Sequence, residues 1–164
     1  MDQRDNALAG ENLGWRLETI VYLQLVRTYK PLGYDIYYLS DRSGECDFVV
    51  CKNNQVKQAI QVSYDISSPK TRKREIDGLL LAHKKTKCTN LLLLTDHEYS
   101  QITENKVDIK IQPVYDWVLE IGKRKEWIGH ESFYSLPPNK IKHFYSVVAN
   151  KNAIWKNIGV KIFL

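Results

Sequence analysis

Long hydrophobic runs are scarce in this sequence of 164 residues. The longest unbroken aliphatic run is Leu91–Leu94, which is far too short to cross a bilayer, so we expect no membrane span. The first residues, Met1–Asp5, are polar and carry two acids, so they lack the basic and then apolar pattern of a secretory signal. These absences favour a cytoplasmic protein.

Cysteine and histidine, the usual ligands of zinc, are also few. The chain holds 3 cysteines, an odd number without metal-ligand spacing, and 4 dispersed histidines, so neither a zinc site nor a disulfide framework is expected. No Gly-x-x-x-x-Gly-Lys-Ser/Thr loop occurs. The chain alone is therefore not expected to hydrolyse nucleotides.

The composition is that of a globular protein, with 43% hydrophobic and 26% charged residues. The length suits one compact domain, which we place at 1–122, followed by an aromatic and basic C-terminal extension at 123–164. The net charge of +5 is compatible with a polyanionic partner, although many basic soluble proteins bind no nucleic acid.

Hydrophobic periodicity and turn residues predict an alternation of helices and strands. We expect helices at 11–29, 71–85, with Thr71 as the cap, and 113–120, where Gly122 ends the helix. Strands are expected at 35–39, 45–51, 56–64, 90–95 and 108–112, the first three antiparallel. Such an order is typical of α/β folds.

Two of the predicted strands carry polar pairs that could form a site. Because side chains alternate along a strand, Glu45 and Asp47 should share one face, while Cys46, Phe48 and Val50 share the other. By the same rule, Gln61 and Ser63 should project together from the next strand. The first predicted helix places Glu18 on its inner face, so Glu18, Asp47, Gln61 and Ser63 are the candidate catalytic residues.

This set resembles a metal-dependent phosphodiesterase site with two groups altered. An acid on one strand and an acid-x-Lys triplet on the next could hold Mg²⁺ or Mn²⁺ and activate water. Here Glu18, Asp47 and Gln61 are the candidate metal ligands, but Gln61 is neutral and Ser63 cannot supply a positive charge. A replacement cation could come from the basic residues that open the following helix: Lys70, Arg72, Lys73 and Arg74.

Simpler interpretations remain open for each of these residues. Asp47 could be a solvated carboxylate near a turn, and Glu18 could pair with a base such as Arg74. The basic residues Arg72, Lys73 and Arg74 are candidates for nucleic-acid binding, but such a run is more often a solvated start of a helix.

Six blocks, taken in order, resemble the C-terminal domain of unknown function carried by prokaryotic AAA-type ATPases. That domain is similar to the PD-(D/E)XK nuclease superfamily, which implies a restriction-endonuclease-like, three-layer fold with a central mixed sheet and an αβββαβ core. The blocks are Asn12–Glu18, Gly44–Val49, Ile60–Asp65, Lys73–Glu75, Leu92–Asp96 and Ile111–Trp117.

By this resemblance, Glu18 matches the helix acid and Asp47 the metal-binding acid, whereas Gln61 and Ser63 stand where an acid and a lysine are found in active members. The resemblance implies a degenerate nuclease-like domain that binds nucleic acid, or regulates, as part of an AAA-type ATPase system. Two alternatives stay open: an active metal-dependent DNA nuclease, and a protein-interaction domain, including a homodimer, without a nucleic-acid role.

Overall fold

The structure is a computed structural model that describes residues 3–123 and 160–162, with side chains described over 13–121. Its elements are α1 (Gln3–Tyr29), η1 (Lys30–Leu32), β1 (Asp35–Asp41), β2 (Gly44–Lys52), β3 (Gln55–Val62), α2 (Pro69–Thr86), β4 (Leu91–Thr95), β5 (Ser100–Glu104), β6 (Val107–Pro113), α3 (Val114–Lys123) and β7 (Val160–Ile162). The predicted α/β class is confirmed.

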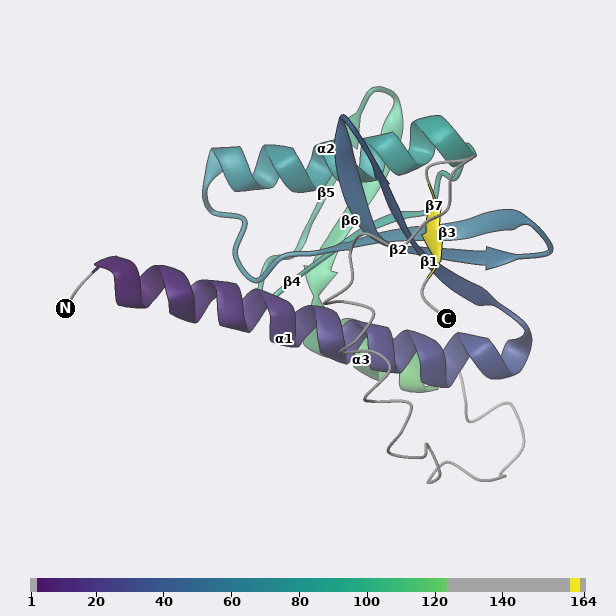
Figure 1. The fold of residues 1–164 in the computed structure, drawn as a ribbon, viewed down its shortest axis with the longest axis horizontal. Helices are drawn as coiled ribbons and strands as arrows, with labels where there is room; N and C mark the ends of the chain where they lie inside the picture. The colour runs from purple at the N-terminus through teal and green to yellow at the C-terminus, as the bar shows by residue number, and fades with distance from the viewer. Residues whose placement is uncertain (1–2, 124–159, 163–164) are drawn as a thin grey trace.

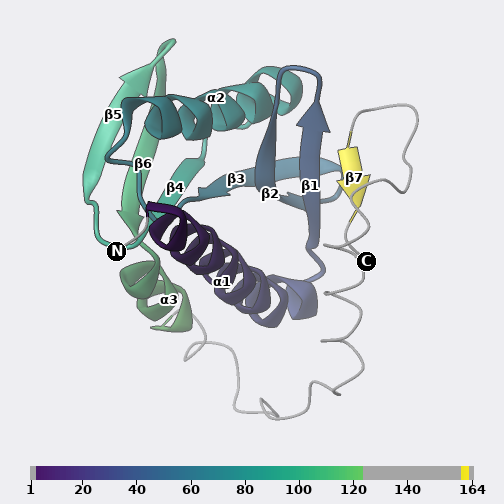
Figure 2. The same cartoon turned by 60° about the vertical axis from the view of Figure 1, so that its left-hand side comes forward.

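A mixed sheet forms the middle layer, with strand order β5-β6-β4-β3-β2-β1-β7. Helix α2 covers one face, whereas α1 and α3 cover the other (Figures 1 and 2). Each face has its own apolar core: Leu79 of α2 packs with Leu93 on one side, and Val21 of α1 packs with Trp117 of α3 on the other. The central part of the sheet is therefore buried on both faces, and all five residues of β4, Leu91–Thr95, are buried.

The first half of the chain follows the sequence prediction, except that α1 begins at Gln3 rather than at residue 11. Strands β1, β2 and β3 are successive antiparallel neighbours. The turn between β2 and β3 places Asn53 and Asn54 at φ 52° and 59°, the left-handed pair that suits a tight hairpin. Helix α1 ends at Tyr29, before Pro31 and Gly33, which adopts φ 74°.

Three predictions in the second half were wrong. Helix α2 begins at Pro69 behind Ser68 rather than at a Thr71 cap, because proline fits the first helical turn. Strand β5 was missed, since it is mostly polar and exposed at a sheet edge. Helix α3 continues through Gly122 to Lys123 instead of ending there.

The C-terminal extension lies mostly outside the described residues. Its described part is β7, which pairs antiparallel with β1, with Lys161 opposite Tyr38. The boundary at 122 therefore stays a prediction. Helices of the described residues are all too short or too polar to span a membrane.

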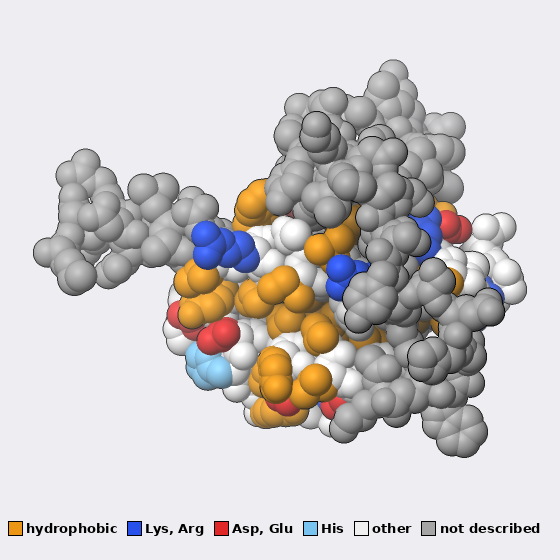
Figure 3. Space-filling model, turned by 90° about the horizontal axis from the view of Figure 1, so that it is seen from below, with side chains coloured by type: hydrophobic (Ala, Val, Ile, Leu, Met, Phe, Trp, Pro, Cys, Tyr) orange, Lys and Arg blue, Asp and Glu red, His pale blue; other side chains and the backbone are white. Residues whose placement is uncertain are grey.

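Helices α1 and α3 leave several apolar side chains at the surface. Trp15 and Ile20 of α1 and Tyr115 and Leu119 of α3 are exposed. Figure 3, seen from below, shows apolar side chains gathered on this side of the molecule. The polar cleft lies elsewhere, between α1, α2 and the strands β2 and β3.

Candidate functional site

An irregularity in strand β2 sets the direction of Asp47. Tyr37 of β1 pairs with Val49, but Leu39 pairs with Cys46, so β2 carries one extra residue there. Such a bulge interrupts the alternation of side chains and turns one of them aside. Cys46 consequently packs in the core beneath α2, whereas Phe48 packs in the core beneath α1. Phe48 and Val50 share a face as predicted, whereas the prediction that Cys46 lies with them was wrong for this reason.

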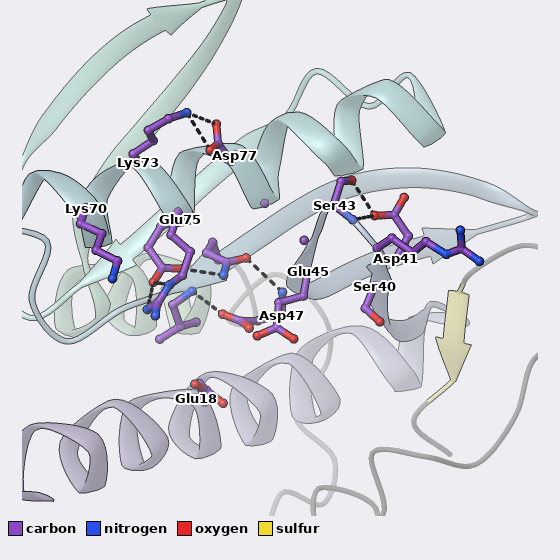
Figure 4. A pocket seen from close by; sticks show the side chains of 16 residues that line it. Glu18, Ser40, Asp41, Ser43, Glu45, Asp47, Lys70, Lys73, Glu75 and Asp77 are labelled. Atoms are coloured by element: carbon purple, nitrogen blue, oxygen red, sulfur yellow. Dashed lines mark hydrogen bonds and ion pairs between the residues drawn. The ribbon is translucent and has the colours of Figure 1, made fainter.

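A polar cleft of about 660 Å³ opens where β2 and β3 meet the two large helices. Glu18 points from α1 toward Asp47 and Glu45, with Lys70 and Glu75 on the side of α2 (Figure 4). The cleft is lined by Glu18, Ser40, Asp41, Arg42, Ser43, Gly44, Glu45, Asp47, Gln61, Val62, Lys70, Lys73, Arg74, Glu75, Asp77 and Gly78. Three of the four predicted catalytic residues thus share one cleft.

Asp47 is held by the neighbouring strand through both its backbone and its side chain. Its Oδ2 accepts a hydrogen bond from the Val62 N–H at 2.8 Å, and its own N–H donates to Gln61 Oε1 at 3.1 Å. Desolvation, and then the nearby charge of Glu18, raise the pKa of Asp47 well above its ordinary value. An extra positive charge in the cleft would favour the ionised carboxylate.

Gln61 links Asp47 to a carboxylate that the sequence analysis did not single out. Its Nε2 donates to Glu75 Oε2 at 2.6 Å. Both side chains are deeply buried, and Arg74 donates to the other Glu75 oxygen from its Nε at 3.0 Å. Gln61 is therefore a neutral bridge between Asp47 and Glu75, and a carboxylate at this position would face Glu75 directly.

A helical-phase argument could have identified Glu75 from the sequence. Glu75 precedes Leu79 by four residues and Ala82 by seven, and both of these are fully buried. The same spacing placed Glu18 on the inner face of α1, ahead of Val21 and Leu25. In the sequence, however, Glu75 directly follows a run of basic residues, a pattern typical of a solvated helix start, and this pattern hides its inward position.

Ser63 does not join the cleft. Strand β3 ends at Val62, so the alternation that links Gln61 to Ser63 does not continue. The Ser63 hydroxyl donates to the Asp65 carbonyl at 3.3 Å, and its N–H donates to the Leu94 carbonyl at 2.9 Å. The residue at the lysine position is thus buried in a local structural role, and the expected convergence of Gln61 and Ser63 was wrong.

Arg72, Lys73 and Arg74 each form an ion pair with a different acid. Arg72 forms an ion pair with Glu98 at 2.8 Å and does not line the cleft, whereas Lys73 pairs with Asp77 at 2.8 Å on its rim. Arg74 pairs with the buried Glu75. Lys70, and Arg42 in the turn between β1 and β2, also line the cleft.

A comparison with models of protein families identifies the family of this chain. A family model described as "Domain of unknown function (DUF4143)" matches residues 13–117. The chain belongs to the DUF4143 family. The match runs from α1 to α3 and so includes Glu18, Asp47, Gln61 and Glu75.

One archaeal relative of this DUF4143 chain has been catalogued as an uncharacterized protein. MJ1544 of Methanocaldococcus jannaschii is 29% identical over 115 residues, which cover 66% of this chain and 25% of the relative. The chain thus spans about a quarter of the length of the curated relative it matches. No solved structure matches the chain.

The DUF4143 cleft has oxygen donors but no closed metal centre. Within residues 13–121, no three His, Cys, Asp or Glu side chains are grouped so that they could hold one metal ion. Mg²⁺ is commonly bound by one or two carboxylates together with water and substrate phosphate. The donor set fits an open site of that kind, in which a metal ion would supply positive charge next to Asp47.

The raised pKa of Asp47 gives a prediction for stability. We expect Asp47→Asn to raise the free energy of unfolding by about 1–2 kcal/mol near pH 8, with little change near pH 4. The folded protein holds the Asp47 proton to a higher pH than the unfolded chain does. The cost of ionisation therefore grows as the pH rises past the ordinary aspartate pKa and is complete above the raised value. Urea unfolding in EDTA, from about pH 4 to about pH 8, measures the difference in free energy of unfolding between the variant and the wild type.

Asp41→Asn is a matched control with the opposite sign. Hydrogen bonds from Lys85 and then Ser43 hold the pKa of Asp41 below its ordinary value. Its stabilising contribution is present above the ordinary aspartate pKa and is lost as the pH falls, so this variant should be less stable than the wild type near neutral pH. An Asp47→Asn variant that is equally destabilised at every pH would contradict the electrostatic explanation.

Proposed function

We propose that this DUF4143 domain is a degenerate PD-(D/E)XK nuclease-like module that binds nucleic acid at the polar cleft and serves an AAA-type ATPase. The observation that carries the proposal is that Glu18 and Asp47 line one cleft, although the two residues are 29 positions apart in the sequence and belong to different elements. The element order α1-β1-β2-β3-α2-β4 agrees with the αβββαβ core that the sequence resemblance implies.

The mixture of charges in the cleft supports a phosphate-bearing partner joined by a divalent cation. The carboxylates of Glu18, Glu45 and Asp47 would repel a phosphodiester by themselves, whereas Lys70 and Arg42 on the lining would attract it. Mg²⁺ or Mn²⁺ would supply the charge that joins a phosphate to the carboxylates. The proposed binding is thus strongest when metal and DNA are both present.

The comparison with MJ1544 supports a role as one part of a longer polypeptide, because the matched region is only 25% of that relative. We propose that the ATPase partner lies in the same or another polypeptide.

A second candidate function, metal-dependent hydrolysis of DNA, is favoured by one observation. Ser63 stands at the position where active nucleases have a lysine, and it carries no positive charge. The guanidinium of Arg74 lines the cleft and could supply that charge instead. A cation beside a phosphodiester stabilises the charge that develops during hydrolysis. Cleavage assays therefore accompany the binding assays below.

The test compares wild type, Asp47→Ala and Asp108→Ala with labelled single-stranded and duplex DNA, in EDTA, Mg²⁺ and Mn²⁺. Asp108 is exposed on β6 outside the cleft, so its variant controls for the change of charge. We expect wild type to bind with a dissociation constant of about 10⁻⁴ to 10⁻⁶ M. Metal should strengthen this binding at least about tenfold, and only Asp47→Ala should lose that gain.

Absence of DNA binding by wild type at low salt, with and without Mn²⁺, would overturn the proposal and leave the protein-interaction alternative. Metal-dependent cleavage that disappears in Asp47→Ala but persists in Asp108→Ala would establish the second candidate function.

A further inference from the structure

Strand β3 lacks a carboxylate and a cation at the cleft, and helix α2 presents both at consecutive positions. Glu75 and Arg74 line the same cleft as Asp47. Glu75 is only 2% exposed, which is unusual for an acid unless its charge is compensated. Its compensation comes from Arg74 on one oxygen and Gln61 on the other.

The hydrogen-bond network ties Glu75 to Asp47 through a single side chain. Gln61 donates to Glu75 at 2.6 Å and accepts the Asp47 N–H at 3.1 Å. A carboxylate oxygen has more than one lone pair, so Glu75 can keep its bond to Gln61 and still accept a further partner. The two acids therefore border one cleft with a neutral amide between them.

Helix α2 is brought this close by a glycine. A Cβ at Gly78 would clash with the Glu45 carbonyl oxygen and would lie 3.2 Å from Gln61 Oε1. Gly78 follows Glu75 by about one helical turn, so both lie toward the sheet. The absence of a side chain at Gly78 lets α2 lie close to β2 and β3. At this short distance, Glu75 lines the cleft.

Arg74 differs from the adjacent basic residues in its position at the cleft. Its side chain is 73% exposed while its guanidinium contacts the buried Glu75. The charges of Glu75, Glu45 and Asp47 all act on it, so it lies in the field of the cleft acids. Arg72, two residues earlier, is turned to Glu98 outside the cleft.

We propose that Glu75 and Arg74 take the places of the two groups that β3 lacks: Glu75 is the second carboxylate of the divalent-cation site with Asp47, and Arg74 contacts the bound phosphate. Gln61 is then a positioning residue that holds the Glu75 carboxylate and the Asp47 backbone N–H. This inference rests on the proposed function, because it assigns residues within the same cleft. It changes the predicted metal set from Glu18, Asp47 and Gln61 to one centred on Asp47 and Glu75.

The first experiment measures Mn²⁺ binding by electron paramagnetic resonance, with the protein saturated by a short oligothymidylate. Glu75→Gln keeps the size of the side chain and an oxygen that can accept from Gln61, so the fold should persist. We expect it to weaken Mn²⁺ binding at least about tenfold. Asp108→Asn, which changes an exposed acid of β6 outside the cleft, should stay within about twofold.

The second experiment measures DNA affinity against salt concentration for Arg74→Ala and Arg72→Ala. Loss of one phosphate contact should reduce the slope of log affinity against log salt by about 1 in Arg74→Ala only. Urea unfolding of each variant identifies any change due to misfolding.

The outcomes separate this inference from the proposed function. Wild-type binding of Mn²⁺ and DNA, with unchanged Mn²⁺ affinity in Glu75→Gln, would overturn the inference while the proposed function stands. A wild type that binds no DNA would overturn both. Loss of Mn²⁺ affinity in Glu75→Gln together with a lower salt slope in Arg74→Ala would support it.

Discussion

Gly78→Ala is expected to lower the free energy of unfolding by about 2–4 kcal/mol. The new methyl group would clash with the Glu45 carbonyl oxygen, and it would stand 3.4 Å from the Glu45 carbonyl carbon. A backbone group in the sheet cannot rotate aside as a flexible side chain can. Helix α2 must therefore shift away from β2, which weakens the apolar packing around Leu79.

Gly14→Ala on α1 is the matched control. Gly14 also lies within a helix, but a Cβ there would meet no atom of the described residues within 4 Å. Because alanine favours helix more than glycine does, this variant should gain about 0.5–1 kcal/mol. Chemical denaturation of the three proteins measures the difference, and equal effects of the two substitutions would show that α2 does not depend on close approach at Gly78.

Gly78→Ala should also weaken the binding of Mn²⁺ and oligothymidylate at the cleft, if the position of α2 places Glu75 there as proposed. Urea titration with and without Mn²⁺ and oligothymidylate would show less stabilisation of this variant by the ligands than of wild type, because binding to the folded state alone raises stability.

Gln61→Leu is expected to lower the free energy of unfolding by about 2–4 kcal/mol. Leucine has a similar size but no hydrogen-bonding group, so it removes both the bond to Glu75 Oε2 and the bond from the Asp47 N–H. Glu75 would keep Arg74 but lose its buried amide partner. Leaving buried polar groups unpaired costs more than the net value of the hydrogen bonds.

Gln101→Leu controls for the change of residue type, because Gln101 is exposed on the edge strand β5. It should change the free energy of unfolding by no more than about 0.5 kcal/mol. The measurement is urea unfolding followed by circular dichroism. A Gln61→Leu protein as stable as wild type would mean that the Asp47, Gln61 and Glu75 network contributes little to the fold.

Much of the architecture was predictable because its causes are local. Apolar residues at helical spacing marked α1, and Asn53 and Asn54 marked the turn between β2 and β3. Strand β5 was not predictable in the same way, since an exposed edge strand needs no apolar face. Its pairing with β6 decides its structure.

The candidate site was predictable only in part. The inner-face position of Glu18 and the strand position of Asp47 led correctly to a shared cleft. Strand alternation failed at Ser63, because β3 had already ended, and at Cys46, because an extra residue in β2 changed the face. Alternation holds only while a strand continues in regular pairing.

The sequence by itself determined the order of helices and strands apart from β5 and β7, the DUF4143 membership, and the presence of glutamine and serine where an acid and a lysine would be expected. These features depend on residue type and on neighbours within a few positions. Only the tertiary structure decided that Glu75 reaches Gln61, that Arg74 rather than Arg72 joins the cleft, and that the bulge places Asp47 there. The first two depend on how α2 packs against β2 and β3, and the third depends on how β1 pairs with β2; no local pattern contains either arrangement.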